Sequence, residues 1–359
     1  MLIGLIGKPN CGKSTFFKAS TLAEVLIANY PFATIKPNHG VGYVKVEDIG
    51  PEFNVISMPQ KGFLLGKWRF VPIELYDVAG LVPGASEGKG LGNQFLDNLT
   101  AADVLIHIVD ASGTTDIEGK PAENHDPIKD IEFLEQELTL WYLNILKKVW
   151  KTFARKTEQE NQEIEKAITK QFSGLKINED QVKIILKKLD FKQSISNWTD
   201  DQLYQFSYQL LKYSKPIIIA ANKSDHENAE ANIKKIESAF PDYLIYPCSA
   251  DSELALREAS KHDLIDYIPG ENNFKIKKEL NDKQKQALEK IKKNVLDKFG
   301  GTGVQEILNL AVFDLLKYIA IFPAGANKLA DQFGNVLPDC FLLPEGSTAL
   351  DFAYKIHKD

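Results

Sequence analysis

Five apolar runs of strand length recur along the chain and set its predicted architecture. They lie at MLIGLIG (residues 1–7), Phe70–Val78, Ala102–Ala111, Lys215–Asp225 and Tyr243–Ala250. Apolar runs of this length without polar alternation are typical of strands buried on both faces, as in parallel sheets. Helical stretches separate most of these runs. The alternation predicts an α/β fold, built on a doubly wound and mainly parallel sheet.

One long region breaks this alternation. Between about Pro127 and Ser214 no strand-like run occurs. An apolar stripe at helical spacing occupies its first part and consists of Ile131, Leu134, Leu138, Trp141 and Ile145. Further helices are predicted to begin behind the polar residues Asn178 and Thr199. The pattern predicts a helical insertion over residues 128–214, a hairpin of long helices inside the α/β domain.

The other boundaries follow from that insertion. The α/β domain is predicted to consist of residues 1–127 and 215–317. Residues 318–359 carry short strand patterns, Gly and Pro punctuation and one small helix. About 40 residues are marginal for an independent hydrophobic core. We expect this tail either to pack against the rest of the chain or to be the first part of a domain that continues beyond Asp359.

Composition narrows the functional classes. The 359 residues include 49 Asp and Glu against 43 Lys and Arg, a formal net charge of −6. This balance is not that of a globally basic nucleic-acid binder, although it leaves a local basic face open. No apolar run approaches the roughly 20 residues that cross a bilayer, and the N-terminus has no signal-peptide pattern. Three scattered cysteines indicate a reducing compartment, so we expect a cytoplasmic protein without a membrane span, disulfide framework or zinc site.

The first glycine-rich segment has the form of a phosphate-binding loop. GKPNCGKS lies between the first strand-like run and the helical stretch KSTFFKAST, and it matches G-x-x-x-x-G-K-[ST]. Its glycines permit a compact loop whose N–H groups point at phosphate oxygens, beside the positive end of a helix dipole. Lys13 is expected to reach the β- and γ-phosphates, and the Ser14 hydroxyl to ligate Mg²⁺. The candidate phosphate-binding residues are Gly7, Lys8, Pro9, Asn10, Cys11, Gly12, Lys13, Ser14 and Thr15.

Two further segments are candidate γ-phosphate sensors. Asp77 ends a strand-like run, and Gly80 completes the pattern D-x-x-G. We expect Asp77 to hold Mg²⁺ through water and the Gly80 N–H to contact the γ-phosphate. Thr34, in NYPFATIKPNHGV, is the candidate for a second Mg²⁺-ligating hydroxyl, in place only when the γ-phosphate holds its loop. The alternative interpretations are a plain strand-end carboxylate and a threonine in an ordinary loop.

A fourth segment, NKSD, is the candidate base-reading motif. The Asp225 carboxylate can accept hydrogen bonds from the N1–H and 2-amino groups of guanine, whereas adenine would leave its charge unpaired. Lys223 is expected to pack over the base, and Asn222 to tie neighbouring loops together. The fifth run ends in CSA, whose members are Cys248, Ser249 and Ala250. The last N–H of this segment is expected at the guanine O6, and the ordered motifs together predict a domain that binds GTP and GDP.

These motifs resemble those of the Obg-like GTPases, most closely the archaeal and eukaryotic branch of the YchF type. The likeness spans nearly the whole chain and rests on G-x-P-N-x-G-K-S, Y-P-F-A-T-I-x-P-N, D-V-A-G-L-V-P-G-A, G-K-G-L-G-N-Q-F and N-K-S-D. It implies a helical insertion in the GTPase domain and a C-terminal TGS module, of which residues 318–359 look like the first half of a β-grasp fold. It also implies a ribosome or RNA partner. Some YchF relatives have an altered base-reading motif and prefer ATP, whereas this chain retains NKSD, so we expect GTP.

The catalytic step is not assigned by these motifs. Leu81 stands where Ras-like enzymes carry the water-orienting glutamine, and a leucine cannot polarise water. Hydrolysis then needs a backbone group, a monovalent cation or a residue from a partner. In several related GTPases an asparagine at the position of Asn10 helps hold K⁺ beside the phosphates. The alternative is that Asn10 only bonds within its loop, and the candidates are therefore the Gly80 backbone and an Asn10-bound K⁺.

The leading hypothesis is a GTP-hydrolysing molecular switch with a slow intrinsic rate, associated with the ribosome and read out by the helical insertion and the tail. The alternatives are a GTP-binding scaffold with negligible hydrolysis and a P-loop ATPase or kinase. KKVWKTFARK (Lys147–Lys156) mixes five cations with Trp150 and Phe153. It is either an RNA-facing strip, with phosphate attraction and stacking, or a solvated helix face with an apolar seam. The sequence sets no oligomeric state.

Overall fold

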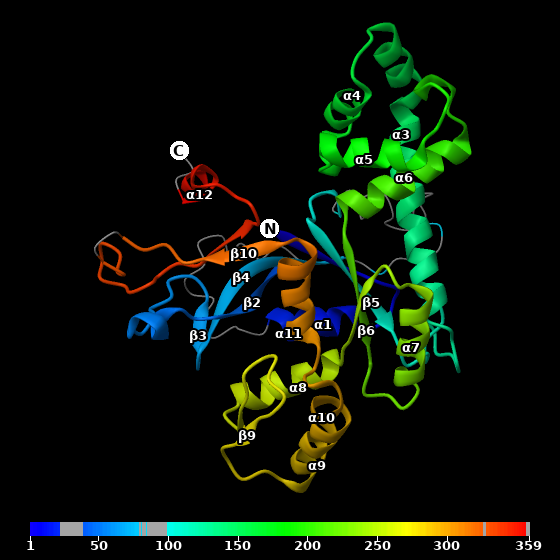
Figure 1. Cartoon of the computed structure of the whole chain (residues 1–359). Helices are drawn as coiled ribbons and strands as arrows, with labels where there is room; N and C mark the ends of the chain where they lie inside the picture. Colours follow the sequence, from blue (N-terminus) through cyan, green and yellow to red (C-terminus); the bar gives the residue numbers. More distant parts are fainter. Residues whose placement is uncertain (22–38, 79, 81–83, 85–98, 326–327, 357–359) are drawn as a thin grey trace.

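The fold was analysed in a computed structural model of the chain (Figure 1). It describes residues 1–21, 39–78, 80, 84, 99–325 and 328–356. Two positions singled out in the sequence, Thr34 and Leu81, lie outside these described residues.

A seven-stranded sheet forms the centre of the molecule. Its strands are β1 (Leu2–Ile6), β2 (His39–Glu47), β3 (Phe63–Leu65), β4 (Trp68–Asp77), β5 (Val104–Asp110), β6 (Ile217–Asn222) and β7 (Leu244–Pro247). The order is β2-β4-β1-β5-β6-β7, with β3 paired to β4. Neighbours from β4 to β7 run parallel, whereas β2 and β3 pair antiparallel with β4. The predicted parallel-dominant α/β fold is confirmed, and the antiparallel β2 and β3 are additions that the sequence analysis missed.

The register of this sheet brings the ends of distant strands together. Leu5 in β1 pairs with Asp77 in β4, and Asp110 in β5 pairs with Asn222 in β6. Because the strands are parallel, the segments that follow β1, β4, β5 and β6 all emerge at one edge. The predicted phosphate-binding and base-reading segments therefore share one edge of the sheet.

Helices cover both faces of the sheet. They include α1 (Lys13–Thr21), α8 (Ala250–Lys261) and α11 (Val304–Asn309) on one face, and α3 (Ile128–Gln159) and α7 (Ala229–Ala239) on the other. Phe16 of α1 and Ile307 of α11 belong to one buried apolar cluster with β1 and β5 residues. Ile131 of α3 and Ile236 of α7 belong to another, with Val109 of β5. The sheet is thus buried on both faces, as its continuous apolar runs predict.

Residues 128–214 are helical, but they do not form a simple hairpin. Their helices are α3, α4 (Ile164–Gln171), α5 (Glu179–Leu189) and α6 (Asp200–Ser214), with short 3₁₀ turns at Ser173–Leu175 and Ile195–Asn197. Asn178 and Thr199 cap α5 and α6 through capping boxes, as the sequence predicts. In this fully described region only α3, with 32 residues, is long. None of the described helices is apolar enough over sufficient length to cross a membrane.

The Lys147–Lys156 strip has an apolar seam. Trp150 is 5% exposed and stacks on Trp198, with their ring centroids 5.2 Å apart. Phe206 and Phe172 complete the aromatic cluster around it. The Trp150 ring is therefore committed to the core of the insertion, which overturns the alternative in which it stacks on an RNA base.

The remaining elements follow β7. They are β8 (Ile265–Asp266), β9 (Lys275–Ile276), α9 (Asp282–Ile291), α10 (Asp297–Phe299), β10 (Tyr318–Ile321), β11 (Phe341–Pro344) and α12 (Ala349–Ile356), with π-helical turns at Lys292–Leu296 and Leu310–Leu315. A 3₁₀ turn at Gly50–Phe53 lies earlier in the chain. The tail is tied to the sheet by Arg69 of β4, which is fully buried and donates to the Leu337 and Pro338 carbonyls at 2.7 Å each. It therefore packs against the rest of the chain.

Acid should destabilise the fold through His107 in β5. Burial, followed by the charge of Lys8, lowers the pKa of His107 from 6.5 to about 3. Between these values the unfolded chain binds a proton that the folded chain excludes, so stability present above pH 6.5 is lost as the pH falls toward 3. We expect this residue to cost about 3 kcal/mol by pH 4. Urea unfolding at pH 7 and pH 4 measures the loss, and a His107→Leu variant with an equal pH dependence would contradict the assignment.

Candidate nucleotide-binding site

A cavity of about 570 Å³ lies at the edge of the sheet where the strand ends converge. Its lining comes from the segments after β1, β4, β6 and β7 and comprises Lys8, Pro9, Asn10, Gly12, Lys13, Ser14, Thr15, Gly80, Asn222, Lys223, Asp225, His226, Ser249 and Asp251. Most of the candidate residues from the sequence therefore share one cavity. His226 and Asp251 were not among them, although each directly neighbours a residue that was.

The loop between β1 and α1 has a backbone that only glycine accommodates at two positions. Gly7 has φ +154°, and a Cβ there would come within 2.5 Å of the Ile108 carbonyl oxygen. Gly12 has φ +94°, and a Cβ there would lie 2.2 Å from Asn222 Nδ2. Between them Asn10 is left-handed at φ +59°, and Cys11 is fully buried. The loop is thus folded tightly onto β5 and onto the base-reading segment.

Lys13 and Ser14 both contact Asp77 at the phosphate end of the cavity. Lys13 Nζ lies 2.8 Å from Asp77 Oδ1, and the Ser14 hydroxyl donates to Asp77 Oδ2 at 3.0 Å. A hydroxyl and a carboxylate are the hard oxygen donors that suit Mg²⁺. Among the described residues no group of three or more His, Cys, Asp or Glu side chains forms a metal site. Ser14 and Asp77 therefore fit a Mg²⁺ whose other ligands are waters and phosphate oxygens, as is usual for this ion.

The opposite end of the cavity is built around Asn222 and Asp225. Asn222 Nδ2 donates to the Cys11 carbonyl at 2.9 Å, and Asn222 Oδ1 accepts from the Ala250 N–H at 3.0 Å. Asp225 Oδ1 accepts from the Ser249 hydroxyl at 2.8 Å, which orients its carboxylate. One amide side chain therefore connects the loops after β1, β6 and β7.

Cys11 and Cys248 lie behind these loops. Both side chains are fully buried. Burial raises the pKa of the Cys11 thiol to about 11 and that of the Cys248 thiol well above its ordinary value. Thiols of this kind are protonated at neutral pH and are poor nucleophiles. They act as small packing groups.

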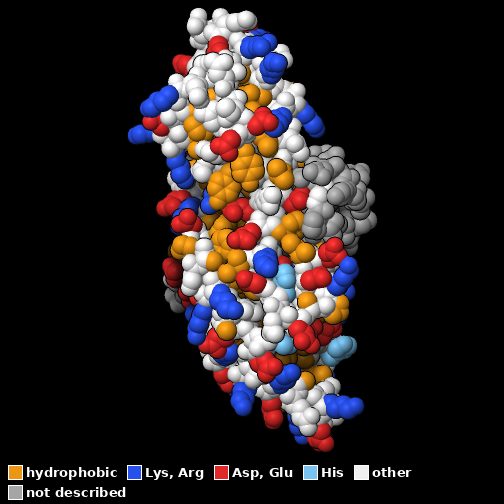
Figure 2. Space-filling view, turned by 90° about the vertical axis from the view of Figure 1, so that its right-hand side faces the viewer, with side chains coloured by type: hydrophobic (Ala, Val, Ile, Leu, Met, Phe, Trp, Pro, Cys, Tyr) orange, Lys and Arg blue, Asp and Glu red, His pale blue; other side chains and the backbone are white. Residues whose placement is uncertain are grey.

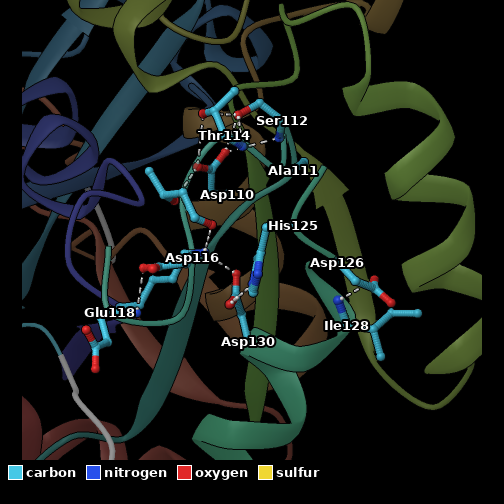
Figure 3. A network of polar contacts seen from close by, with 12 residues as sticks. Asp110, Ala111, Ser112, Thr114, Asp116, Glu118, His125, Asp126, Ile128 and Asp130 are labelled. Atoms are coloured by element: carbon cyan, nitrogen blue, oxygen red, sulfur yellow. Dashed lines mark hydrogen bonds and ion pairs between the residues drawn. The ribbon is translucent and has the colours of Figure 1, made fainter. Parts of the chain in front are cut away.

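Asp110, at the end of β5, supports the site through Lys223 and was missed by the sequence analysis. Its fully buried carboxylate lies 2.7 Å from Lys223 Nζ and accepts from Ser112 and Thr115, as Figure 3 shows in part. Burial acts to raise the pKa of Asp110, but the hydrogen bonds from Lys223, Ser112 and Thr115 outweigh it and lower the pKa. The signal was present in the sequence as an Asp that ends an apolar run. Its partner is 113 residues away and could not be read from the pattern.

The segment after Asp110 also reaches the phosphate-binding loop. Lys8 Nζ lies 2.7 Å from both the Thr115 carbonyl oxygen and Asp130 Oδ2, and its side chain is almost fully buried. Asn10 Nδ2 donates to the Gly119 carbonyl at 2.9 Å. The side chains of Lys8 and Asn10 therefore contact neighbouring segments of this protein. The sequence pattern of the loop does not predict these contacts.

Comparison with known proteins gives the family. Residues 2–144 match the family model described as 50S ribosome-binding GTPase. Residues 220–325 match the one described as Obg-like GTPase YGR210-like, G4 motif-containing domain. A GTP-binding protein of Methanocaldococcus jannaschii is 47% identical over 100% of this chain and 90% of its own length. The chain belongs to the Obg-like GTPase family.

Two further proteins similar to this chain extend the comparison. A crystal structure of a GTP-binding protein from Pyrococcus horikoshii superposes with a TM-score of 0.78 at 39% identity, covering 99% of this chain and 90% of that one. The ribosome-binding ATPase YchF of Buchnera aphidicola from Acyrthosiphon pisum is 30% identical over 99% of this chain and 84% of its own length. The motif-based resemblance is thus confirmed. Because the family includes proteins named for GTP and for ATP, membership alone does not decide the base.

Proposed function

We propose that this Obg-like protein is a GTP-binding and GTP-hydrolysing molecular switch with a slow intrinsic rate, acting in the cytoplasm. The observation that carries the proposal is the position of Asp225, which lines the same cavity as the phosphate-binding loop. The Ser249 hydroxyl bond holds one carboxylate oxygen. A carboxylate fixed in this way accepts from the two guanine donors and has no matching donor on adenine. The alternatives remain a GTP-binding scaffold with negligible hydrolysis and a P-loop ATPase or kinase.

At the phosphate end, Lys13 supports the same proposal. It pairs with Asp77 at 2.8 Å, with both side chains about nine-tenths buried. A phosphate in the loop offers this ammonium a stronger anionic partner than Asp77 alone. We propose that Ser14, Asp77 through water, and Thr34 hold Mg²⁺, and that the Gly80 N–H contacts the γ-phosphate. When bound, Mg²⁺ neutralises negative charge on the phosphates.

The hydrolytic group remains a choice between the Gly80 backbone and a cation at Asn10. The hydrogen bond from Asn10 to Gly119 supports the alternative in which Asn10 stabilises its loop. We therefore favour a site organised by backbone groups, completed by a partner, over one that depends on K⁺.

We propose that the helical insertion reads the nucleotide state out to the ribosome or to RNA, together with the tail as a TGS-like module. Residues 147–192 hold twelve Lys and Arg against seven Asp and Glu, a net charge of +5, although the whole chain carries −6. A groove of about 630 Å³ on this part is lined by Lys148, Lys156 and Lys170. Figure 2 shows Lys and Arg side chains around the upper end of one face. Such a surface suits phosphate groups.

The base preference is tested by titrating GTP, GDP, ATP and ADP against the purified protein. We expect the guanine nucleotides to bind at least roughly 100-fold more tightly than the adenine nucleotides, because only guanine satisfies Asp225. Asp225→Asn should remove most of this preference. Glu227→Gln, an exposed acid two residues further on, is the matched control and should keep it. Equal affinities of the unmodified protein for GTP and ATP would favour the ATPase alternative.

The role of Asn10 is tested by phosphate release in KCl and in NaCl at equal ionic strength. If Asn10 only stabilises its loop, turnover should agree within roughly twofold in the two salts, and Asn10→Ala should lower it equally in both. A roughly tenfold stimulation by K⁺ that Asn10→Ala abolishes would instead establish the cation. Absence of any release, with GTP bound, would favour the scaffold.

The insertion surface is tested by replacing Lys148, Lys156 and Lys170 with glutamine and measuring RNA affinity at several salt concentrations. Loss of three phosphate contacts should weaken binding and reduce the slope of log K against log salt by about two. The control replaces three exposed lysines of α9, Lys283, Lys285 and Lys290, in the same way. Equal slopes in the two triple variants would place the RNA contact elsewhere.

A further inference from the structure

Two carboxylates on the first part of α3 contact the two segments that flank the phosphate end of the cavity. Asp130 lies 2.7 Å from Lys8 Nζ, in the phosphate-binding loop. Glu137 Oε1 accepts from the Gly84 N–H at 2.8 Å, four residues after Gly80. Asp130 and Glu137 are seven residues apart, which places them on the same face of the helix. The helix that begins the insertion is thus bonded to both phosphate-facing segments.

The Lys8–Asp130 pair is the stronger of these two contacts. The two side chains are 1% and 2% exposed, and His125 Nε2 lies 2.7 Å from the other Asp130 oxygen (Figure 3). Lys8 Nζ also donates to the Thr115 carbonyl. Separating a buried pair would leave uncompensated charge in a region shielded from water, which is strongly unfavourable. The start of α3 and the phosphate-binding loop are therefore held together.

The other end of α3 lies in the positively charged part of the insertion. With 32 residues, α3 is about 48 Å long. Its last turns carry Lys148 and Lys156 of the groove and pack Trp150 against Trp198. A continuous helix that is packed at both ends transmits a small tilt at its base as a larger displacement at its tip. The geometry therefore connects the nucleotide cavity to the proposed RNA surface.

We propose that Asp130 and Glu137 are positioning residues that couple the bound nucleotide to the orientation of the insertion. This inference rests on the proposed function. Lys8 is part of the loop proposed to surround the β-phosphate, whereas Gly80 and Gly84 belong to the segment proposed to contact the γ-phosphate. Gly80 already lies against Pro9 of the loop, where a Cβ would come within 3.0 Å of the Pro9 nitrogen. A γ-phosphate that binds between the two segments therefore changes their spacing. Because both segments are bonded to α3, the change in their spacing tilts this helix. GTP and GDP then stabilise different orientations of α3, and with it of the insertion.

The experiment is hydrogen–deuterium exchange on the full chain with GDP and with a non-hydrolysable GTP analogue. In the unmodified protein, peptides that cover residues 149–159 and 164–171 should differ in exchange rate by roughly threefold to tenfold between the two nucleotides. Asp130→Asn should reduce this difference to less than roughly twofold, with both nucleotides still bound at saturating concentration. Glu132→Gln, an exposed acid on the same helix with the same change in charge, should retain the full difference.

Nucleotide binding is measured first in each protein, by fluorescence of a labelled nucleotide. An unmodified protein that binds no nucleotide refutes the proposed function. Binding without any nucleotide-dependent exchange in the insertion refutes only the coupling, and so does an Asp130→Asn protein that exchanges like the unmodified one. If Asp130→Asn does not fold, the double variant Lys8→Met with Asp130→Leu fills the same space without charge and serves in its place. Retention of the full difference in that variant overturns the proposal.

Discussion

The side-chain amide of Asn222 is the interaction on which the arrangement of the cavity depends. It donates to the Cys11 carbonyl and accepts from the Ala250 N–H, so it joins three loops that follow three different strands. The requirement extends to Gly12, where any Cβ would meet the Asn222 nitrogen. Two segments more than 200 residues apart thereby form one wall, and the helical insertion is accommodated between them without separating the phosphate end from the base end. A buried amide without hydrogen-bond partners would cost free energy. The arrangement that joins the three loops is therefore also the one in which the Asn222 amide has its hydrogen-bond partners.

Three lysines around this cavity are each paired with a carboxylate, and their environments give them different roles. Lys8 and Asp130 are buried together and Lys223 binds the fully buried Asp110, so both pairs fix loops in place. In the third pair it is the carboxylate that is more accessible, because Asp77 is 12% exposed against 2% for Asp130 and 0% for Asp110. Its partner Lys13 lines the phosphate end of the cavity. An incoming phosphate can bind Lys13 with little further desolvation of its ammonium group, because that group is already largely removed from water in the folded protein. Two pairs therefore build the site, and the third is suited to exchange its partner.

The extent to which sequence predicted this structure follows from the range of each signal. Local patterns sufficed for the parallel strands, for α1 and for the caps at Asn178 and Thr199, because apolar runs and capping residues act over a few positions. Local patterns failed for β2. This strand contains two glycines, which weaken its strand pattern, and it forms through long-range antiparallel pairing with β4. They also failed for the partners of Lys8 and Asp110, which come from other parts of the chain. The type of residue at the site was predictable, whereas the residues that hold it in place were not.

The charge distribution explains why a net charge of −6 is compatible with the proposed nucleic-acid partner. The +5 of residues 147–192 means that the rest of the chain carries −11. At physiological ionic strength electrostatic effects decay over about 8 Å, whereas Lys148 lies 18 residues along α3 from Asp130, which is about 27 Å. A phosphate group near Lys148 or Lys170 therefore experiences the local lysines and little of the acidic remainder. The separation holds for Lys148 and Lys156 on α3, whereas Lys176 of the same region pairs with Asp103 of the α/β domain at 2.6 Å. In the proposed coupling, the length of α3 turns a small tilt at Asp130 into a larger displacement at its far end. The proposed RNA contact and the proposed coupling thus depend on one helix.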